Sequence, residues 1–95
     1  MAIGNVELAA NTWVQIADSG LASVSWQVKA GTTVYIAATA ADAAPAEPDD
    51  DWPEYGFNQG EVALDSTAMF AGVTSAAFLW AYSPGKAGTI WVSHA

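Results

Sequence analysis

The sequence predicts an all-β protein, a small antiparallel sandwich or barrel of about six to eight short strands. Three observations predict this class: short stretches rich in β-branched and aromatic residues, turn residues between them, and apolar side chains that alternate with polar ones. No window has a convincing helical period. The length of 95 residues suits one domain, so we expect residues 1–95 to form a single β domain.

Six strands are expected along the chain, at residues 12–17, 22–28, 32–38, 61–64, 76–82 and 88–93. In the second of these, Val24, Trp26 and Val28 share one face while serines, Gln27 and Lys29 share the other. This alternation is typical of a half-buried antiparallel strand. A short turn of helix is expected within residues 64–72, with Asp65 or Ser66 as its N-cap.

An internal similarity divides the chain into two halves. Residues 29–38, KAGTTVYIAA, resemble residues 86–95, KAGTIWVSHA, and both lysines of the protein lie in these two copies. Each half would contain a strand, a glycine-containing turn and a second strand, and an acidic, proline-rich loop at residues 40–60 would join them. The alternative is chance, because Ala, Gly and Thr are common in this chain.

The charge balance excludes two classes of partner. Ten acidic residues oppose two lysines, with no arginine, for a net charge of -8. Binding to nucleic acid or to an anionic membrane requires cations, so neither is expected. The start of the chain lacks the pattern of a signal peptide, and the uncharged run 66–85 contains too many polar residues for a membrane span.

The chain has few residues that carry out catalysis. It has no cysteine, and its single histidine, His94, is next to last. We therefore expect no enzyme, no catalytic residue and no cofactor. Charged residues make up only 13% of the chain, which predicts exposed apolar surface and hence a homo-oligomer.

The acidic loop raises the possibility of a metal site. Six of the ten acids lie between residues 40 and 60, and Asp49, Asp51 and Glu61 are the calcium ligands we would test first. The sequence DDDWPEYGFNQGE does not have the spacing of a known calcium loop, however. A solvated connector is the simpler interpretation, and we expect no metal.

The aromatic residues fall into three groups. Trp26 and Trp80 share faces with apolar neighbours and are candidates for the core. Trp13 and Trp91 share faces with polar neighbours, so they either face outward or are buried by sheet twist or a covering loop. An outward tryptophan is a candidate interface anchor.

The third aromatic group lies at the end of the acidic loop. Within it, residues 44–51, APAEPDDD, are expected to be extended and mobile, whereas residues 52–57, WPEYGF, are expected to dock. The docking surface is either the chain's own sheet or a neighbouring chain. The candidate interface residues are therefore Trp13, Trp52, Tyr55, Phe57 and Trp91.

Several stretches resemble a known class of proteins. NTWVQIAD near the start, GTTVYIAA before the proline-rich loop, FLWAY late in the chain and the ending IWVSHA are similar to small accessory virion proteins of tailed bacteriophages and prophages. The resemblance implies a structural protein of the virion, assembled in the host cytoplasm and without cofactors. Its partners would be the major capsid protein or tail subunits. A capsid decoration (cement) protein is the leading expectation, and a tail, collar or fibre component is the alternative within the class.

A carbohydrate-binding module is the alternative from another class. Such modules stack sugar rings on a row of exposed aromatic side chains. The row would have to include Trp13, Trp91 and Trp52 on one flat face open to solvent. An interface anchor would instead lie under a neighbouring subunit.

Overall fold

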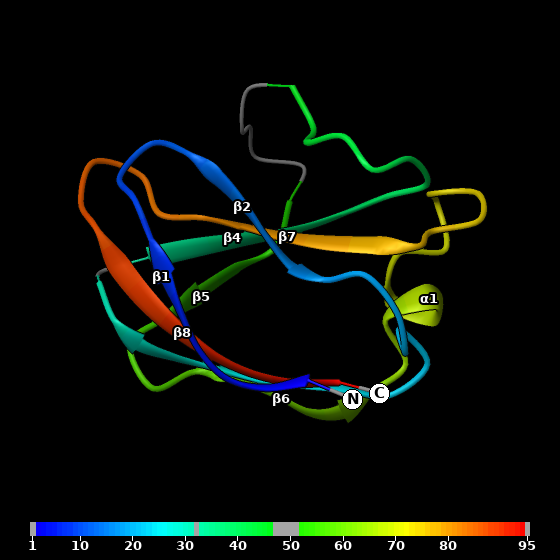
Figure 1. The fold of residues 1–95 in the computed structure, drawn as a ribbon, viewed down its shortest axis with the longest axis horizontal. Helices are drawn as coiled ribbons and strands as arrows, with labels where there is room; N and C mark the ends of the chain where they lie inside the picture. Colours follow the sequence, from blue (N-terminus) through cyan, green and yellow to red (C-terminus); the bar gives the residue numbers. More distant parts are fainter. Residues whose placement is uncertain (1, 32, 47–51, 95) are drawn as a thin grey trace.

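The computed structural model describes residues 2–31, 33–46 and 52–94, and these residues form two four-stranded sheets packed face to face (Figure 1). The predicted all-β sandwich is confirmed. The elements are β1 (Ala2–Leu8), β2 (Trp13–Ala17), β3 (Val24–Ala30), β4 (Thr33–Thr39), β5 (Glu54–Gly56), β6 (Gly60–Leu64), α1 (Ser66–Met69), β7 (Phe78–Tyr82) and β8 (Gly88–His94).

The two sheets interleave the two halves of the chain. The first sheet has the strand order β1-β8-β3-β6, and the second has the order β2-β7-β4-β5, with every pair antiparallel. Each pairing therefore joins a strand from β1–β4 to a strand from β5–β8. Exchanging β1 with β5, β2 with β6, β3 with β7 and β4 with β8 converts one sheet order into the other. The topology thus has an internal twofold symmetry.

The described parts of the two Lys-Ala-Gly-Thr segments, residues 29–31 and 86–89, meet where the chain crosses between the sheets. The connection from β3 to β4 leaves the first sheet, and the connection from β7 to β8 returns to it. Gly88 lies against Ala30: a Cβ atom on Gly88 would come within 2.7 Å of the Ala30 carbonyl oxygen. Neither turn closes a hairpin within one sheet, because the strands on each side of it belong to different sheets.

The twofold symmetry holds for the order of the strands, but the ungapped sequence alignment does not match residues that face the same way. Aligning the two Lys-Ala-Gly-Thr segments without a gap pairs Val34 with Trp91. In the structure Val34 is fully buried between the sheets, whereas Trp91 lies on the outer face of the first sheet beside Gln27. A shift of one residue, which pairs Val34 with the buried Ile90, restores the match of faces.

The core lies between the sheets and follows the predicted alternation. Val24, Trp26 and Val28 are buried, as the sequence predicted, and they pack with apolar residues of the second sheet. The rings of Trp26 and Tyr55 meet edge to face, with centroids 5.5 Å apart. The remaining main contributors are Leu8, Ile16, Val34, Ile36, Leu79, Ala81, Ile90 and Val92.

Two strands were not predicted. β1 contains Gly4 and Asn5, which are poor strand residues, and forms because all seven residues pair with β8 along the edge of the first sheet. β5 is only three residues long and pairs with β4, placing Tyr55 opposite Val34. Both strands depend on a distant partner rather than on local propensity.

The predicted short helix is present as α1, with Asp65 as its N-cap. The Asp65 carboxylate accepts hydrogen bonds from the backbone N–H groups of Thr67 and Ala68 and from the Thr67 hydroxyl. Among the described residues, no helix has the length and apolar character needed to cross a membrane. The uncharged run 66–85 is divided between α1, a turn and β7.

Candidate interaction faces

The outer face of the first sheet is open and is centred on Trp91. In the register of the sheet, Trp91 on β8 lies between Asn5 on β1 and Gln27 on β3. Its side chain is half-buried, as are those of Gln27 and of Ser25 on the same face. We call this surface the Trp91 face; its residues are Ile3, Asn5, Ser25, Gln27, Val62 and Trp91.

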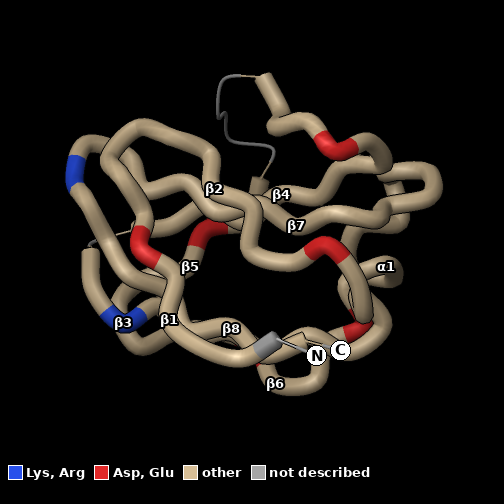
Figure 2. Tube along the Cα trace, viewed as in Figure 1, with Lys and Arg blue, Asp and Glu red and all other residues tan. Residues whose placement is uncertain are grey.

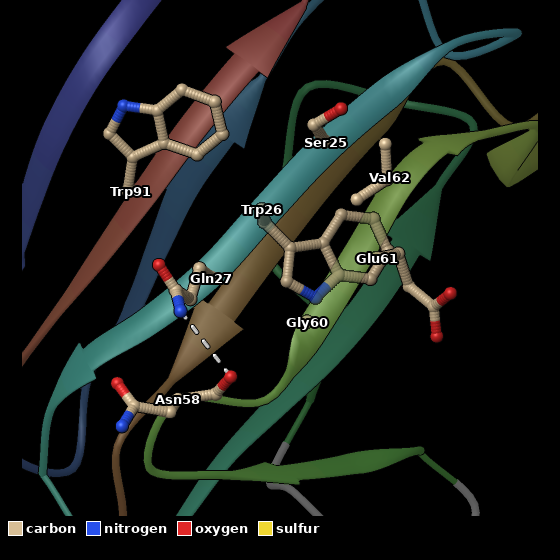
Figure 3. A pocket seen from close by; sticks show the side chains of 8 residues that line it. All are labelled: Ser25, Trp26, Gln27, Asn58, Gly60, Glu61, Val62 and Trp91. Atoms are coloured by element: carbon tan, nitrogen blue, oxygen red, sulfur yellow. Dashed lines mark hydrogen bonds between the residues drawn. The ribbon is translucent and has the colours of Figure 1, made fainter.

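A shallow depression lies beside Trp91 on this face (Figure 3). Its volume is about 390 Å³, and strands β3, β6 and β8 form its walls together with Asn58. The polar groups around it include the side chains of Ser25, Gln27 and Glu61, and the Gln27 amide donates a long hydrogen bond of 3.4 Å to the Asn58 carbonyl oxygen. The depression therefore combines an indole surface with hydrogen-bonding groups and no cation.

Apolar side chains are exposed on the same face. Val62 on β6 is 88% exposed and Ile3 on β1 is 68% exposed. The pairing of β6 with β3 is irregular next to Val62, and Ala63 has a left-handed backbone with φ of 50°. The Ala63 N–H donates to the Ser25 hydroxyl at 2.9 Å, which holds this bulge in place. Bulges of this kind redirect side chains and are frequent beside binding sites.

The outer face of the second sheet also carries aromatic side chains, but the chain covers them. The rings of Trp13 and Tyr82 have centroids 5.1 Å apart, and those of Tyr35 and Tyr82 are 6.4 Å apart. Trp80 lies on this face too and is only 8% exposed. We call this surface the covered face; its residues are Trp13, Gln15, Tyr35, Trp80 and Tyr82.

Residues 40–46, the covering segment, run over this second outer face, on the side away from the first sheet (Figure 1). The Trp13 indole N–H donates to the carbonyl oxygen of Ala46 at 3.0 Å. The Gln15 amide donates to the Asp42 carboxylate at 2.6 Å. The first part of the acidic loop is thus a packed cover, whereas the sequence predicted it to be extended and mobile from residue 44; residues 47–51 lie outside the described residues.

Trp80 is buried, as predicted, but on the outer face of the second sheet, beside Gln15, rather than between the sheets. Its indole N–H donates to the Thr39 hydroxyl at 2.8 Å, just before the covering segment begins. Trp13 is bonded to the covering segment through Ala46, which is the second of the two arrangements that the sequence allowed for it. Both tryptophans for which the sequence left the outward and the covered arrangement open are half-buried, and only Trp91 lines an open depression.

The aromatic end of the acidic loop docks on its own chain. Trp52 packs against Phe70, with centroids 6.1 Å apart, and Tyr55 is 9% exposed. Phe57 remains 59% exposed at the turn between β5 and β6. Of these three candidate interface residues, Phe57 presents the most side-chain surface to a partner.

The Tyr55 hydroxyl lies at the edge of the core and donates to the Glu61 carboxylate at 2.9 Å. Burial raises the pKa of Tyr55 above its ordinary value, and the hydrogen bond to Glu61 and the negative charge of that carboxylate raise it further. Glu61, one of the three calcium ligands considered, therefore already has a protein partner. The other two, Asp49 and Asp51, lie outside the described residues.

The charges are unevenly distributed. Both lysines lie toward the end of the sandwich where the two crossing turns meet, and the described acidic residues are scattered over the molecule, that end included (Figure 2). Within the described part of the chain, no three His, Cys, Asp or Glu residues are grouped to hold a metal ion.

His94 is buried at the end of β8, beside two small hollows of about 240 and 150 Å³ that Ile16 also lines.

The three tryptophans named for a sugar platform do not share a face. Trp91 lies on the first sheet, Trp13 on the second, and Trp52 beside α1 and Phe70. The flat row that the carbohydrate-binding alternative requires is therefore not formed by these residues.

Sequence reasoning missed the partners of the tryptophans. Gln27 lies directly opposite Trp91, and Gln15 lies directly opposite Trp80. The alternation placed Gln27 on a polar face, but no local signal tells which residue of a distant strand lies beside it. Strand register supplies that information.

Comparison of the chain with protein-family models, with curated proteins and with solved structures finds no match.

Proposed function

We propose that this chain is a structural protein of a tailed-phage virion, and specifically a capsid decoration protein that binds the outer shell as an oligomer. The observation that carries the proposal is the Trp91 face. An aromatic ring beside carboxamide groups, bordered by the exposed side chains of Ile3 and Val62, suits a protein partner.

Composition supports the same assignment. The chain has few charges and a net charge of -8, which disfavours nucleic acid and suits contact with other proteins through apolar and hydrogen-bonding surface. The resemblance of NTWVQIAD, GTTVYIAA, FLWAY and IWVSHA to small virion proteins points to the partner class. The partners are then the major capsid protein and further copies of the chain.

The edge of the first sheet offers a second contact. β1 is a seven-residue edge strand whose outer backbone groups are not paired by any other described strand. Edge strands of this length tend to be covered in assemblies. Pairing of β1 with a neighbouring subunit would extend the sheet that carries Trp91.

Binding to purified capsid shells tests the proposal. The full chain is mixed with shells of the major capsid protein encoded with it, and bound protein is measured by co-sedimentation. We expect saturable binding, and sedimentation of the chain alone at micromolar concentration should show an oligomer. A chain that is only monomeric and does not bind shells would contradict the decoration assignment.

The variant Trp91→Ala tests the face itself. If Trp91 anchors the contact, its removal should cost on the order of 2 kcal/mol of binding free energy, or about thirtyfold in Kd. Met69→Ala is the matched control, because Met69 is a partly exposed apolar residue on α1, away from this face. Equal shell binding by both variants would exclude the Trp91 face as the contact.

The alternative within the class is a tail, collar or fibre component. Its oligomerisation would be the same, but shells without tails would not bind the chain. Imaging of particles that carry a labelled chain separates the two positions.

A further inference from the structure

The covered face is an internal example of peptide recognition. Its receptor is a tryptophan and glutamine pair, Trp80 and Gln15, which lie directly opposite each other on neighbouring strands. The covering segment supplies a carboxylate for the glutamine, at 2.6 Å from Gln15 to Asp42. It also supplies a backbone carbonyl for the neighbouring indole of Trp13, at 3.0 Å.

The composition of the covering segment explains why it fits. Five of its seven residues are alanine, with Asp42 and Pro45 as the others, so it brings no bulky side chain other than Pro45 to the sheet. Pro45 is half-buried, and its fixed φ lowers the entropic cost of ordering the segment. The segment bends at residues 40–43, where the Ala43 N–H donates to the Ala41 carbonyl oxygen at 2.8 Å. Aromatic surfaces with hydrogen-bond donors are common receptors for such segments.

The Trp91 face carries the same pair without a cover. Gln27 lies directly opposite Trp91 in antiparallel register, as Gln15 does to Trp80. The Gln27 amide makes only a 3.4 Å contact with a carbonyl oxygen, much longer than the 2.6 Å bond of Gln15. Among the described residues, no hydrogen-bond acceptor contacts the Trp91 indole N–H, whereas the indoles of Trp13 and Trp80 each have one.

The charges around this face have both signs: Glu7 accepts a hydrogen bond from the Thr89 hydroxyl at 3.2 Å, and Glu61 lines the depression. Lys29 is exposed, two residues beyond Gln27 on the same strand, where the register between β3 and β8 shifts. The chain has only two lysines, and Lys29 is the one on the strand that carries Gln27.

We propose that the Trp91 face binds an alanine- and proline-rich segment of another protein chain that carries an Asp or Glu side chain. The carboxylate accepts from the Gln27 amide, a backbone carbonyl accepts from the Trp91 indole, and the small side chains lie over the ring and the depression beside it. Binding of this kind does not require a virion, so the test below is informative whether or not capsid shells bind.

A peptide of the chain's own covering segment is the probe. A capped TAADAAPA peptide, residues 39–46, is titrated to millimolar concentration into the uniformly ¹⁵N-labelled full chain. The indole N–H resonances are followed, with that of Trp91 assigned from Trp91→Phe. We expect a saturable shift of the Trp91 resonance, while those of Trp13 and Trp80 stay in place.

Matched changes on both partners identify the contact. Gln27→Ala should weaken binding about fivefold, the effect of one hydrogen bond of ordinary net strength, and a peptide with Ala in place of Asp should lose a similar factor. Ser93→Ala, on the same face but outside the depression, should leave the affinity within about twofold. All variants are checked for the folded spectrum before titration.

Three results would overturn the proposal. The first is no saturable shift of Trp91 at millimolar peptide. The second is a shift confined to Trp13 and Trp80, which would mean that the peptide only exchanges with the chain's own segment. The third is equal affinity for Gln27→Ala and the unchanged chain.

Discussion

Gly60 shows how a single residue position is fixed by backbone contact. A Cβ atom at this position would lie 1.8 Å from the Trp26 carbonyl oxygen and 2.9 Å from the Gln27 Cα atom. Both are main-chain atoms of β3, so no side-chain rotation can relieve the overlap. Any larger residue must push β6 away from β3, next to the depression of the Trp91 face.

Gly60→Ala should therefore destabilise the fold by roughly 1–3 kcal/mol, the usual cost of overpacking. Gly72→Ala is the control, because a Cβ atom there meets nothing within 4 Å. The free energies of unfolding from urea titrations compare the two variants. Equal stability of both would show that β6 does not approach β3 as closely as described.

Tyr55 links one buried hydroxyl to the pH dependence of stability. Because burial and Glu61 raise its pKa, the folded state keeps the phenol proton at a pH where the unfolded state releases it. The contribution of the Tyr55 hydroxyl to the free energy of unfolding is fully present below the unfolded pKa of about 10, and it declines as the pH rises above that value. A variant without the hydroxyl should therefore lack this part of the alkaline loss of stability.

In Tyr55→Phe we expect a loss of about 1 kcal/mol at pH 7, from the hydrogen bond to Glu61. We also expect a smaller fall in melting temperature between pH 9 and about pH 11 than in the unchanged chain. Thermal unfolding at each pH measures both effects. An identical alkaline slope in the two proteins would contradict the role assigned to Tyr55.

At the scale of elements, α1 is a four-residue helix whose start depends on Asp65. Hydrogen bonding from the Thr67 hydroxyl, with the backbone N–H of Ala68, holds the pKa of Asp65 below its ordinary value. The helix ends at the buried Phe70, which packs against Trp52. The cap thus supports the contact that docks the aromatic end of the acidic loop.

Asp65→Ala should lower the melting temperature by a few degrees at pH 7, whereas Asp65→Asn, which keeps a capping oxygen, should lower it less. A lowered pKa means that the stabilisation is present above the unfolded pKa and is lost as the pH falls through the folded value. The difference between the unchanged chain and Asp65→Ala should therefore shrink on acidification. A difference that stays constant down to pH 2 would exclude the ionised cap.

The strands show which elements local sequence can predict. β3 and β8 have clear alternation and β-branched residues, and both lie close to the predicted ranges. β1 is interrupted by Gly4 and Asn5 and β5 is only three residues long, and both form because β8 and β4 supply backbone partners. The covering segment escaped prediction for the same reason, since its hydrogen bonds join Asp42 and Ala46 to residues about thirty positions away.

At the scale of the whole molecule, the halves depend on each other. All six pairings between strands join one half to the other, so neither half can form a sheet by its own strand pairs. Contacts between residues far apart in sequence therefore dominate the fold. Folding should be slow for a chain of this size.

Division of the chain between residues 47 and 48 tests this dependence. Fragments 1–47 and 48–95 should each lack cooperative unfolding, whereas an equimolar mixture should recover the β-sheet spectrum. The melting temperature of the mixture should rise with concentration, because association is then part of folding. Either fragment unfolding cooperatively as a monomer would contradict the interleaved arrangement.

The sequence by itself determined the fold class, most strand positions, the helix cap and the alternation that buries Val24, Trp26 and Val28. Each follows from propensities and periods that act over a few residues. The tertiary structure decided which strands pair, that Trp80 is buried on the outer face of the second sheet, and that Trp91 lies opposite Gln27 on an open face. These depend on register between distant strands, where a shift of one residue moves a side chain to the opposite face of the sheet.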